Sequence, residues 1–386
     1  MINQITIQNF KSVVNTTFPL KPFNIMIGAN GCGKTNILEA IAIAAAANSN
    51  KLDYEYFANR GIRVVDPKFM LPAFEDVNVD EILLHIETDE NDVSEFKIRY
   101  NKDAKPPKWE DASFNAYSFV GFLKANDIKN MSMLKDFIEK SKLDFEDKQI
   151  NFKFEKTSKG LAISPSCKEL LSFTIYSLEE TILRKADNDS RLYPLGRHGE
   201  GLFAYLKDLA NRENGNGIIQ EIIENLEILD WFDGMEIPKA QLSSEYNIKL
   251  HDRYIDEAIS FFDQRSTNEG FLYLLFYLTL IISDETPTFF AIENIDASFN
   301  PKLCREVVRR LTLLAKKHGK QIIATTHNPS VLDGLDIMGE DHVLLVVRRN
   351  IDGYTKVNNV DTKGKLNMNL SEAWLKGFIG GLPDNF

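Results

Sequence analysis

Cysteine is scarce in this sequence, and its few cysteines lie far apart. Cys32, Cys167 and Cys304 are the only three among 386 residues, and no two of them are spaced as Cys-x-x-Cys. A disulfide framework and a zinc site built on cysteines are therefore both excluded. This usage is typical of a reducing compartment, so we expect a cytoplasmic protein.

The sequence also lacks a long apolar run. The longest one, residues 271–282, contains 12 residues, whereas a membrane-spanning helix needs about 20. The run instead predicts a buried helix. The first residues show no basic stretch followed by an apolar one, so we expect no secretory signal.

A positive net charge is missing as well. The formal net charge of −11 argues against a surface that coats nucleic acid. A local basic patch stays open, because one segment carries Arg305, Arg309, Arg310, Lys316, Lys317 and Lys320. The ordinary interpretation is a solvated helix face, and the alternative is a surface that faces DNA.

What the sequence does have is a glycine-rich loop near its start. Residues 28–35, GANGCGKT, fit the phosphate-loop pattern G-x-x-x-x-G-K-[ST]. The apolar segment 23–27 before the loop predicts a strand, and the Ala-rich segment 36–47 after it predicts a helix. This order of strand, loop and helix argues against a chance glycine turn.

The loop predicts the binding of ATP with Mg²⁺. Its backbone N–H groups can curl around the phosphates, and the helix N-terminus adds a positive dipole end. Lys34 can reach the β- and γ-phosphates, and the Thr35 hydroxyl can ligate Mg²⁺. The nucleotide contacts predicted in this segment are Asn30, Gly31, Gly33, Lys34, Thr35 and Asn36.

Beyond the loop, strand and helix patterns alternate and predict an α/β fold with a sheet that contains parallel strands. Strands are predicted at 5–7, 25–27, 81–87, 96–100, 246–250, 289–292, 322–326 and 342–348. Helices are predicted at 131–140, 218–228, from 266 onward, and at 301–318. Residues 102–108, with two prolines, predict a linker.

This pattern suggests a nucleotide-binding sheet assembled from both ends of the chain. We expect residues 1–105 and 245–386 to form the two parts of an ATPase head, the second with a short tail. Residues 106–244 are expected to be a mostly helical insertion.

Three later segments offer a second half of the site. Residues 266–270, STNEG, precede a long apolar helix and on their own predict an N-cap. The apolar strand 289–292 ends in Glu293, whose carboxylate can hold the water shell of Mg²⁺. Residues 322–326 end at His327, whose neutral imidazole can bond a γ-phosphate or the attacking water, although a histidine at a strand end is commonly structural.

In combined order these motifs resemble the ABC-type, AAA-family ATPase heads of structural-maintenance proteins, RecF-like repair proteins and bacterial defence ATPases. The resemblance implies a P-loop head in which two subunits sandwich two ATP molecules. It assigns the signature motif to Ser266, Glu269 and Gly270, the Walker B acid to Glu293, the D-loop to Asp296, the switch histidine to His327, and a basic residue near the nucleotide to Lys11.

Several features found in members of this family are missing here, which narrows the set of members that the chain can resemble. Long heptads are missing, about 60 residues after His327 are too few for a Toprim nuclease, and neither an R-x-x-x-x-H pair nor an HNH-like cluster occurs. The glutamine loop has no clear position, because Gln149 and Gln264 lack a convincing context. We therefore expect no nuclease centre in this chain.

Residues 291–301, 325–329 and 370–381 most resemble the ATPase subunit of Septu-type and retron-associated phage-defence systems. That resemblance implies an ATP-gated homodimer, with higher assembly left open, and a separately encoded nuclease, of HNH type in Septu. The first alternative is a RecF-like repair ATPase that acts directly on DNA. A transporter ATPase is a second alternative, against which the insertion and the N-terminal strand argue.

The catalytic set predicted from the resemblance is Glu293, Asn294 and His327. Asn294 stands where such heads usually carry a second acid, and an amide is not a base at neutral pH. Slow or absent ATP hydrolysis is therefore expected. The alternatives are that Asp296 substitutes or that the strand register differs by one residue.

One glycine-rich segment stays unassigned. Residues 196–201, GRHGEG, could place Arg197 near the nucleotide or a partner. They equally suit a turn that caps a helix from Leu202.

Overall fold

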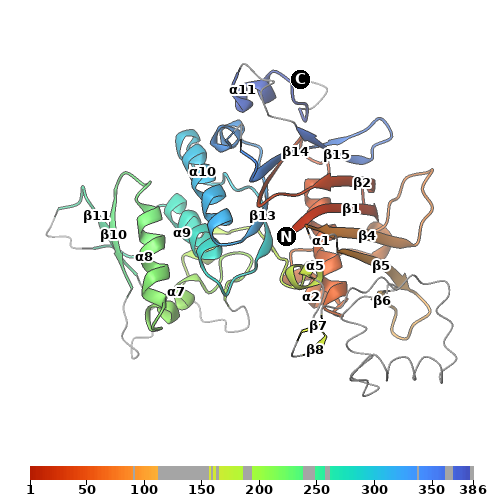
Figure 1. The fold of residues 1–386 in the computed structure, drawn as a ribbon, viewed down its shortest axis with the longest axis horizontal. Helices are drawn as coiled ribbons and strands as arrows, with labels where there is room; N and C mark the ends of the chain where they lie inside the picture. The colour runs from red at the N-terminus through yellow and green to blue at the C-terminus, as the bar shows by residue number, and fades with distance from the viewer. Residues whose placement is uncertain are drawn as a thin grey trace.

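Two large β-sheets face each other across one helix (Figure 1). The fold is seen in a computed structural model, which describes residues 1–89, 92–111, 156–157, 160–161, 165–185, 194–237, 248–256, 261–336, 339–360 and 368–382. The predicted helix at 131–140 and Gln149 lie outside these residues. The α/β class predicted from the sequence is confirmed.

The central sheet carries the phosphate loop. Its strand order is β15 (Thr355–Val360), β14 (His342–Arg349), β3 (Phe23–Ile27), β13 (Gln321–Thr325), β12 (Phe289–Ile292) and β9 (Ile175–Tyr176). All neighbours pair in parallel except β14 and β15, which are antiparallel. As predicted, this sheet draws its strands from both ends of the chain. Its edge strand β9 comes from within the expected insertion, and the boundaries at 105 and 245 stay a prediction.

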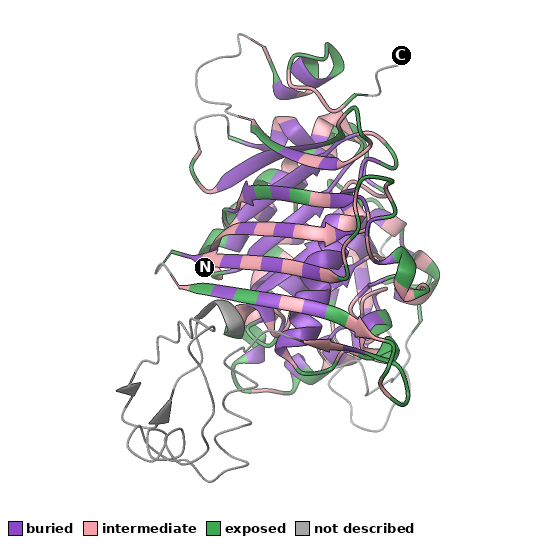
Figure 2. Ribbon diagram, turned by 90° about the vertical axis from the view of Figure 1, so that its right-hand side faces the viewer, coloured by how far each residue is buried: buried purple, intermediate pink, exposed green. Residues whose placement is uncertain are grey.

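The second large sheet is antiparallel, and all of its strands come from residues 2–111. Its order is β2 (Val13–Pro19), β1 (Ile2–Phe10), β4 (Glu81–Thr88), β5 (Val93–Asn101) and β6 (Lys108–Asp111). Burial alternates along β4 (Figure 2), as expected when one face of a sheet covers a core.

The predicted linker at 102–108 is wrong. β6 begins at Lys108 and pairs with β5, so these residues connect two strands of one sheet. The prolines lie in the connection, where no ladder hydrogen bond is lost.

The position of helix α1 (Lys34–Asn48) between the two sheets explains why it is rich in alanine. It packs in one apolar cluster with β1, β4 and β5 on one side and with Met26 and Ile323 of the central sheet on the other. Nearly every residue of α1 is buried. A helix covered on all sides must be apolar all round, and alanines let two sheets approach it closely.

The opposite face of the central sheet is covered by helices. Phe23, Ile25 and Ile27 of β3 join the apolar cluster that contains α9 (Glu269–Ile282) and α10 (Pro301–Lys317). Helices α7 (Leu202–Ala210) and α8 (Gly215–Leu226) pack beyond α9, next to the hairpin β10 (Phe232–Glu236) and β11 (Lys249–Asp252). The strand predicted at 246–250 thus begins at Lys249, and its residues before 248 lie outside the described part.

Short elements complete the described chain. They are α2 (Tyr54–Asn59), the 3-10 turn Pro67–Phe69, β7 (Lys156–Thr157), β8 (Gly160–Leu161), α5 (Pro165–Leu170), α6 (Glu180–Leu183), the 3-10 turn Pro329–Gly334 and α11 (Leu370–Leu375). No helix of the described residues is both long and apolar enough to cross a membrane.

Candidate nucleotide-binding site

The phosphate loop ends in an uncapped helix. Gly33 is the N-cap of α1, has a φ of 112°, and provides no side chain to bond the first N–H groups of the helix. By contrast, Asn268 and Asn300 cap α9 and α10 with side-chain hydrogen bonds. An open N-terminus on a helix of 15 residues offers free N–H donors and a positive dipole end, which fits a phosphate group.

Lys34 is held inside the loop. Its ammonium donates to the carbonyl oxygens of Gly28 at 2.8 Å and Ala29 at 3.2 Å. Burial lowers the pKa of Lys34, while Cys32 and Glu293 nearby act to raise it. Phosphate oxygens at this place would favour the charged form strongly, because opposite charges within a few ångströms stabilise each other.

The Thr35 and Glu293 side chains meet at the carboxyl end of the central sheet. The Thr35 hydroxyl donates to Glu293 Oε1 at 2.8 Å. The hydroxyl is in the first turn of α1, and the carboxylate directly follows β12. Hydroxyl and carboxylate oxygens are hard ligands of the kind Mg²⁺ takes together with water and phosphate oxygens. These two side chains fit the metal of a Mg–ATP complex.

The turn after Glu293 is fixed to the end of β13. Asn294 has a φ of 52°, and its N–H donates to Thr325 Oγ1 at 3.0 Å. Asp296 accepts a hydrogen bond from the Thr326 hydroxyl at 2.5 Å. Asparagine is among the non-glycine residues that tolerate a left-handed backbone. The Asn294 side chain is exposed.

His327 follows these threonines at the same edge of the sheet. Partial burial lowers the pKa of its imidazole, the Lys34 charge lowers it further, and Asp296 opposes them. The ring is therefore neutral at neutral pH and can donate a hydrogen bond from one nitrogen and accept one at the other. The structure thus brings Lys34, Thr35, Glu293 and His327 to one place, the carboxyl end of the central strands, where open α/β sheets bind ligands.

A buried acid in α1 organises the predicted residues Lys11 and Asn36. Glu39 is fully buried, pairs with Lys11, and accepts from Arg63 Nε at 2.6 Å. Arg63 also donates to Asn36 Oδ1 at 2.9 Å, and Asn36 donates to Ser12 Oγ at 2.7 Å. The sequence analysis missed Glu39 and Arg63. A carboxylate inside an Ala-rich apolar helix was the available signal, because a buried charge needs partners.

The hairpin β14–β15 holds the loop from its other side. The Thr355 hydroxyl donates to Cys32 O at 2.8 Å, and Arg349 Nε donates to Gly31 O at 3.0 Å. A Cβ on Gly33 would lie 2.1 Å from Thr355 Oγ1. The loop therefore depends on residues more than 300 positions later.

The predicted signature segment lies beside the Asp296 turn. A Cβ on Gly270 would lie 3.0 Å from Ser298 O, so the start of α9 contacts the end of that turn. Ser266 is exposed, and Glu269 is the first residue of α9. The helix begins three residues later than predicted, because Asn268 accepts the hydrogen bond of the Phe271 N–H.

Gln264 is not placed to serve as a glutamine loop. It is fully buried, and its Oε1 accepts from the Ile248 N–H at 3.1 Å. Residues 196–201 form a turn that ends in Gly201, the N-cap of α7.

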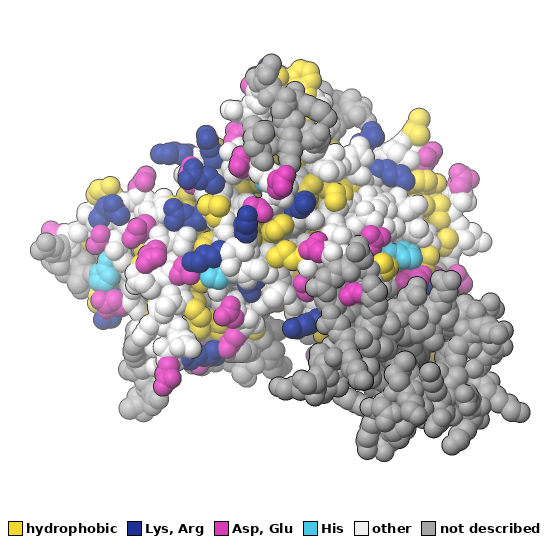
Figure 3. Space-filling model, in the orientation of Figure 1, with side chains coloured by type: hydrophobic (Ala, Val, Ile, Leu, Met, Phe, Trp, Pro, Cys, Tyr) yellow, Lys and Arg dark blue, Asp and Glu magenta, His cyan; other side chains and the backbone are white. Residues whose placement is uncertain are grey.

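The basic residues between positions 305 and 320 lie in different environments. Lys316 pairs with Asp341 and Lys317 with Glu221, whereas Arg305 and Arg309 are exposed. Lys320 does not belong to the surface, contrary to its place in the predicted patch. It is buried and donates to the carbonyl oxygens of Ser283, Thr286 and Pro287. Figure 3 shows Lys and Arg side chains gathered over α10.

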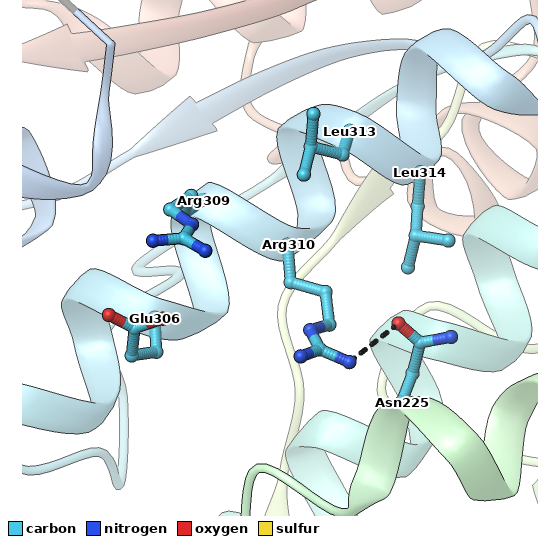
Figure 4. Close-up of a pocket in the computed structure, with 6 residues that line it drawn as sticks. All are labelled: Asn225, Glu306, Arg309, Arg310, Leu313 and Leu314. Carbon is cyan, nitrogen blue, oxygen red and sulfur yellow. Dashed lines mark hydrogen bonds between the residues drawn. The ribbon is translucent and has the colours of Figure 1, made fainter.

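A hollow of about 230 Å³ lies between α8 and α10, away from the phosphate loop (Figure 4). Arg310 donates to Asn225 there at 3.3 Å, and Arg309 and Leu313 line it. It contains none of the predicted nucleotide contacts.

Comparison with known proteins identifies the family and the fold of the chain. The family model described as "AAA ATPase domain" matches residues 1–230, which is more than half of the chain. The chain belongs to the AAA ATPase domain family. A second AAA family model, described as "AAA domain, putative AbiEii toxin, Type IV TA system", matches residues 140–333 of this ATPase chain. No curated protein matches the chain.

Solved structures of similar fold include SMC head domains. The SMC head bound to the C-winged helix domain of ScpA is 17% identical, with a TM-score of 0.53 and coverage of 93% of this chain and 98% of that one. The head with an extended coiled coil bound to the C-terminal domain of ScpA, from Pyrococcus furiosus, is 13% identical, with a TM-score of 0.54 and coverage of 97% and 98%. A Pyrococcus yayanosii head with coiled coil and joint is 12% identical, with a TM-score of 0.50 and coverage of 98% and 99%. The predicted P-loop head fold is therefore confirmed.

Proposed function

We propose that this AAA-family chain binds Mg–ATP and uses its occupancy as a switch. The observation that carries the proposal is the Thr35–Glu293 contact beside the uncapped start of α1. Together they offer hard oxygen ligands for a cation and free N–H groups for phosphates. Lys34, inside the loop, supplies the balancing positive charge.

Hydrolysis is slow in this proposal. His327 is neutral and can hold a water, and Glu293 is engaged with Thr35. Asn294, the next residue, can orient water through its amide oxygen but cannot take its proton at neutral pH. Long residence of ATP suits a sensor of occupancy better than a motor.

The bound nucleotide is shared between two copies of the chain. The start of α9 contacts the Asp296 turn of its own chain through Gly270, and the exposed Ser266 just before it can meet a second copy. A hydroxyl beside a helix N-terminus suits the γ-phosphate held by that copy. ATP would then act as the link between two heads.

The output of the switch is a separately encoded nuclease, of HNH type, in a cytoplasmic anti-phage system. Support comes from the resemblance of residues 291–301 and 325–329 to Septu-type and retron-associated ATPase subunits. The description of the second matching family names a putative AbiEii toxin of a Type IV TA system.

A RecF-like ATPase that acts directly on DNA is the second candidate. The exposed Arg305 and Arg309 on α10 favour it, because phosphate contacts by arginine dominate DNA affinity. Salt-dependent DNA binding by the isolated chain would support this candidate, and co-purification with a small nuclease would support the switch.

The site is tested by Lys34→Ala. Nothing else in the loop can replace the ammonium that neutralises the β/γ charge, so we expect ATP binding to be abolished. Equilibrium dialysis with labelled ATP measures it. Lys376→Ala removes an exposed lysine paired with Glu372 and is the matched control. Equal ATP affinity of wild type and Lys34→Ala would contradict the assignment.

A further inference from the structure

Two backbone hydrogen bonds link Arg197 to Glu293 of the proposed Mg–ATP site. The Glu293 N–H donates to Tyr176 O at 2.8 Å, and the following Ser177 N–H donates to Arg197 O at 2.9 Å. The Glu179 N–H extends this pairing to His198 O at 3.0 Å. Residues 197–198 are therefore held by hydrogen bonds to the chain just beyond the carboxyl end of β9, at the end of the sheet that carries Glu293.

The loop that carries Arg197 is held in one shape. Glu200 accepts the N–H of His198 at 2.8 Å, and the His198 ring bonds Ser177 O at 2.8 Å. A Cβ on Gly199 would lie 2.5 Å from Leu183, which shows how closely the loop packs against α6. A side chain on so restrained a loop loses little freedom when it binds a ligand.

The guanidinium is fixed on one side, and its Nε donor has no partner in the described part of the chain. Arg197 Nη1 donates to Ala58 O at 3.1 Å, and its Cζ would lie 3.5 Å from a Cβ on Gly61. Its Nε is buried and has no hydrogen-bond partner among the described residues. A buried donor without an acceptor is costly, and such a donor calls for an explanation, of which a functional role is one.

The surroundings of Arg197 are acidic. Burial lowers the pKa of the guanidinium, and Glu293 is the strongest of the nearby charges that raise it, ahead of Glu200, Glu179 and Glu39. Among the described residues, however, Glu293 bonds Thr35 and forms no ion pair with Arg197. The Arg197 cation is thus close to Glu293, the Walker B acid, but is not paired with it and can still bind another anion.

We propose that Arg197 binds the terminal phosphate of the ATP held by the phosphate loop of the same chain. The proposal rests on the proposed function and adds a residue that distinguishes ATP from ADP. An oxygen of the γ-phosphate supplies an acceptor to the guanidinium, whose Nε has none within the described ranges. An arginine fork suits phosphate oxygens, and its charge balances the triphosphate beside Glu293.

The test compares a non-hydrolysable ATP analogue with ADP in titration calorimetry, with Mg²⁺ present. Arg197→Ala should weaken binding of the analogue by about tenfold or more, as loss of a charge-assisted hydrogen bond does. ADP affinity should stay within about twofold, because ADP has no terminal phosphate at that position. Arg197→Lys should recover part of the loss, since it keeps the charge and loses the fork.

Arg212→Ala is the matched control. Arg212 follows the far end of α7 and pairs with Asp208 and Glu285, so both affinities should equal those of wild type. Thermal melting of each variant confirms that the fold is kept.

Equal loss for the analogue and for ADP would mean that Arg197 only supports the fold, and unchanged affinity for both would also overturn the proposal. Failure of the proposed function is a different result: wild type would bind neither nucleotide, or Lys34→Ala would bind like wild type.

Discussion

At the residue scale, the site depends on contacts between residues far apart in sequence. Thr35 and Glu293 are 258 positions apart and share one hydrogen bond. Each could be predicted, because each belongs to a local pattern: a glycine loop before a helix, and an acid after an apolar strand. Glu39 was missed, because its partners Lys11 and Arg63 come from other segments. Arg197 was left open between a nucleotide contact and a turn, because its position depends on pairing with the chain just after β9.

Asn294→Glu should speed hydrolysis without changing ATP affinity, because it adds a general base beside the expected water. General bases contribute about 10²–10⁴-fold. The variant should also lose about 1–2 kcal/mol of stability, since glutamate disfavours the left-handed backbone at the φ of 52° seen here. Steady-state phosphate release and denaturant unfolding measure the two effects.

Asn294→Gln controls for side-chain length, because its amide is longer but not basic. Equal rates for the two variants would contradict the role of the acid. Wild-type turnover above about 1 s⁻¹, within the ordinary enzyme range, would contradict the slow switch.

At the scale of elements, runs of buried residues were the reliable signal. β3, β12, β13 and β14 lie at or within two residues of their predicted bounds, because parallel central strands are apolar throughout. The segment 102–108 was mistaken for a linker, since two prolines mark the connection within a hairpin as well as a boundary. Lys320 was mistaken for a surface cation, because the carbonyl oxygens that receive it come from a separate turn.

The contact between the phosphate loop and β15 predicts different effects for two glycines. At Gly33 the φ is 112° and a Cβ would meet Thr355 at 2.1 Å, whereas at Gly31 the φ is 75° and nothing lies within 4 Å of a Cβ. Gly31→Ala should cost about 1–2 kcal/mol for the backbone alone. Gly33→Ala should cost about 1–3 kcal/mol more from overpacking and should lose ATP binding.

Urea unfolding of both variants and dialysis with labelled ATP provide the comparison. If the two substitutions cost the same free energy of unfolding, the hairpin does not support the loop as described.

At the scale of the whole molecule, the predicted pairing of two heads puts the start of α9 at a subunit interface. Ser266→Arg replaces an exposed hydroxyl with a bulky cation. ATP binding to the single chain should remain, while association in the presence of a non-hydrolysable analogue should be lost. Sedimentation velocity measures the association.

Gln220→Arg adds the same charge on the exposed face of α8 and should associate like wild type. Wild-type association of Ser266→Arg would show that the sandwich is assembled differently or not at all.

The order of the central sheet also has a consequence for how the protein is made. β3 lies between β13 and β14, and both begin after residue 320. Roughly 294 residues separate the end of β3 from the start of β13, the first of its neighbours to be made, which takes a ribosome roughly 15–60 s at about 5–20 residues per second. During that interval the strand before the phosphate loop has no neighbour on either side, and Thr355 has not yet been added. A nascent or prematurely ended chain therefore carries the GANGCGKT motif without the ability to hold a nucleotide, and ATP binding is among the last properties that the growing chain acquires.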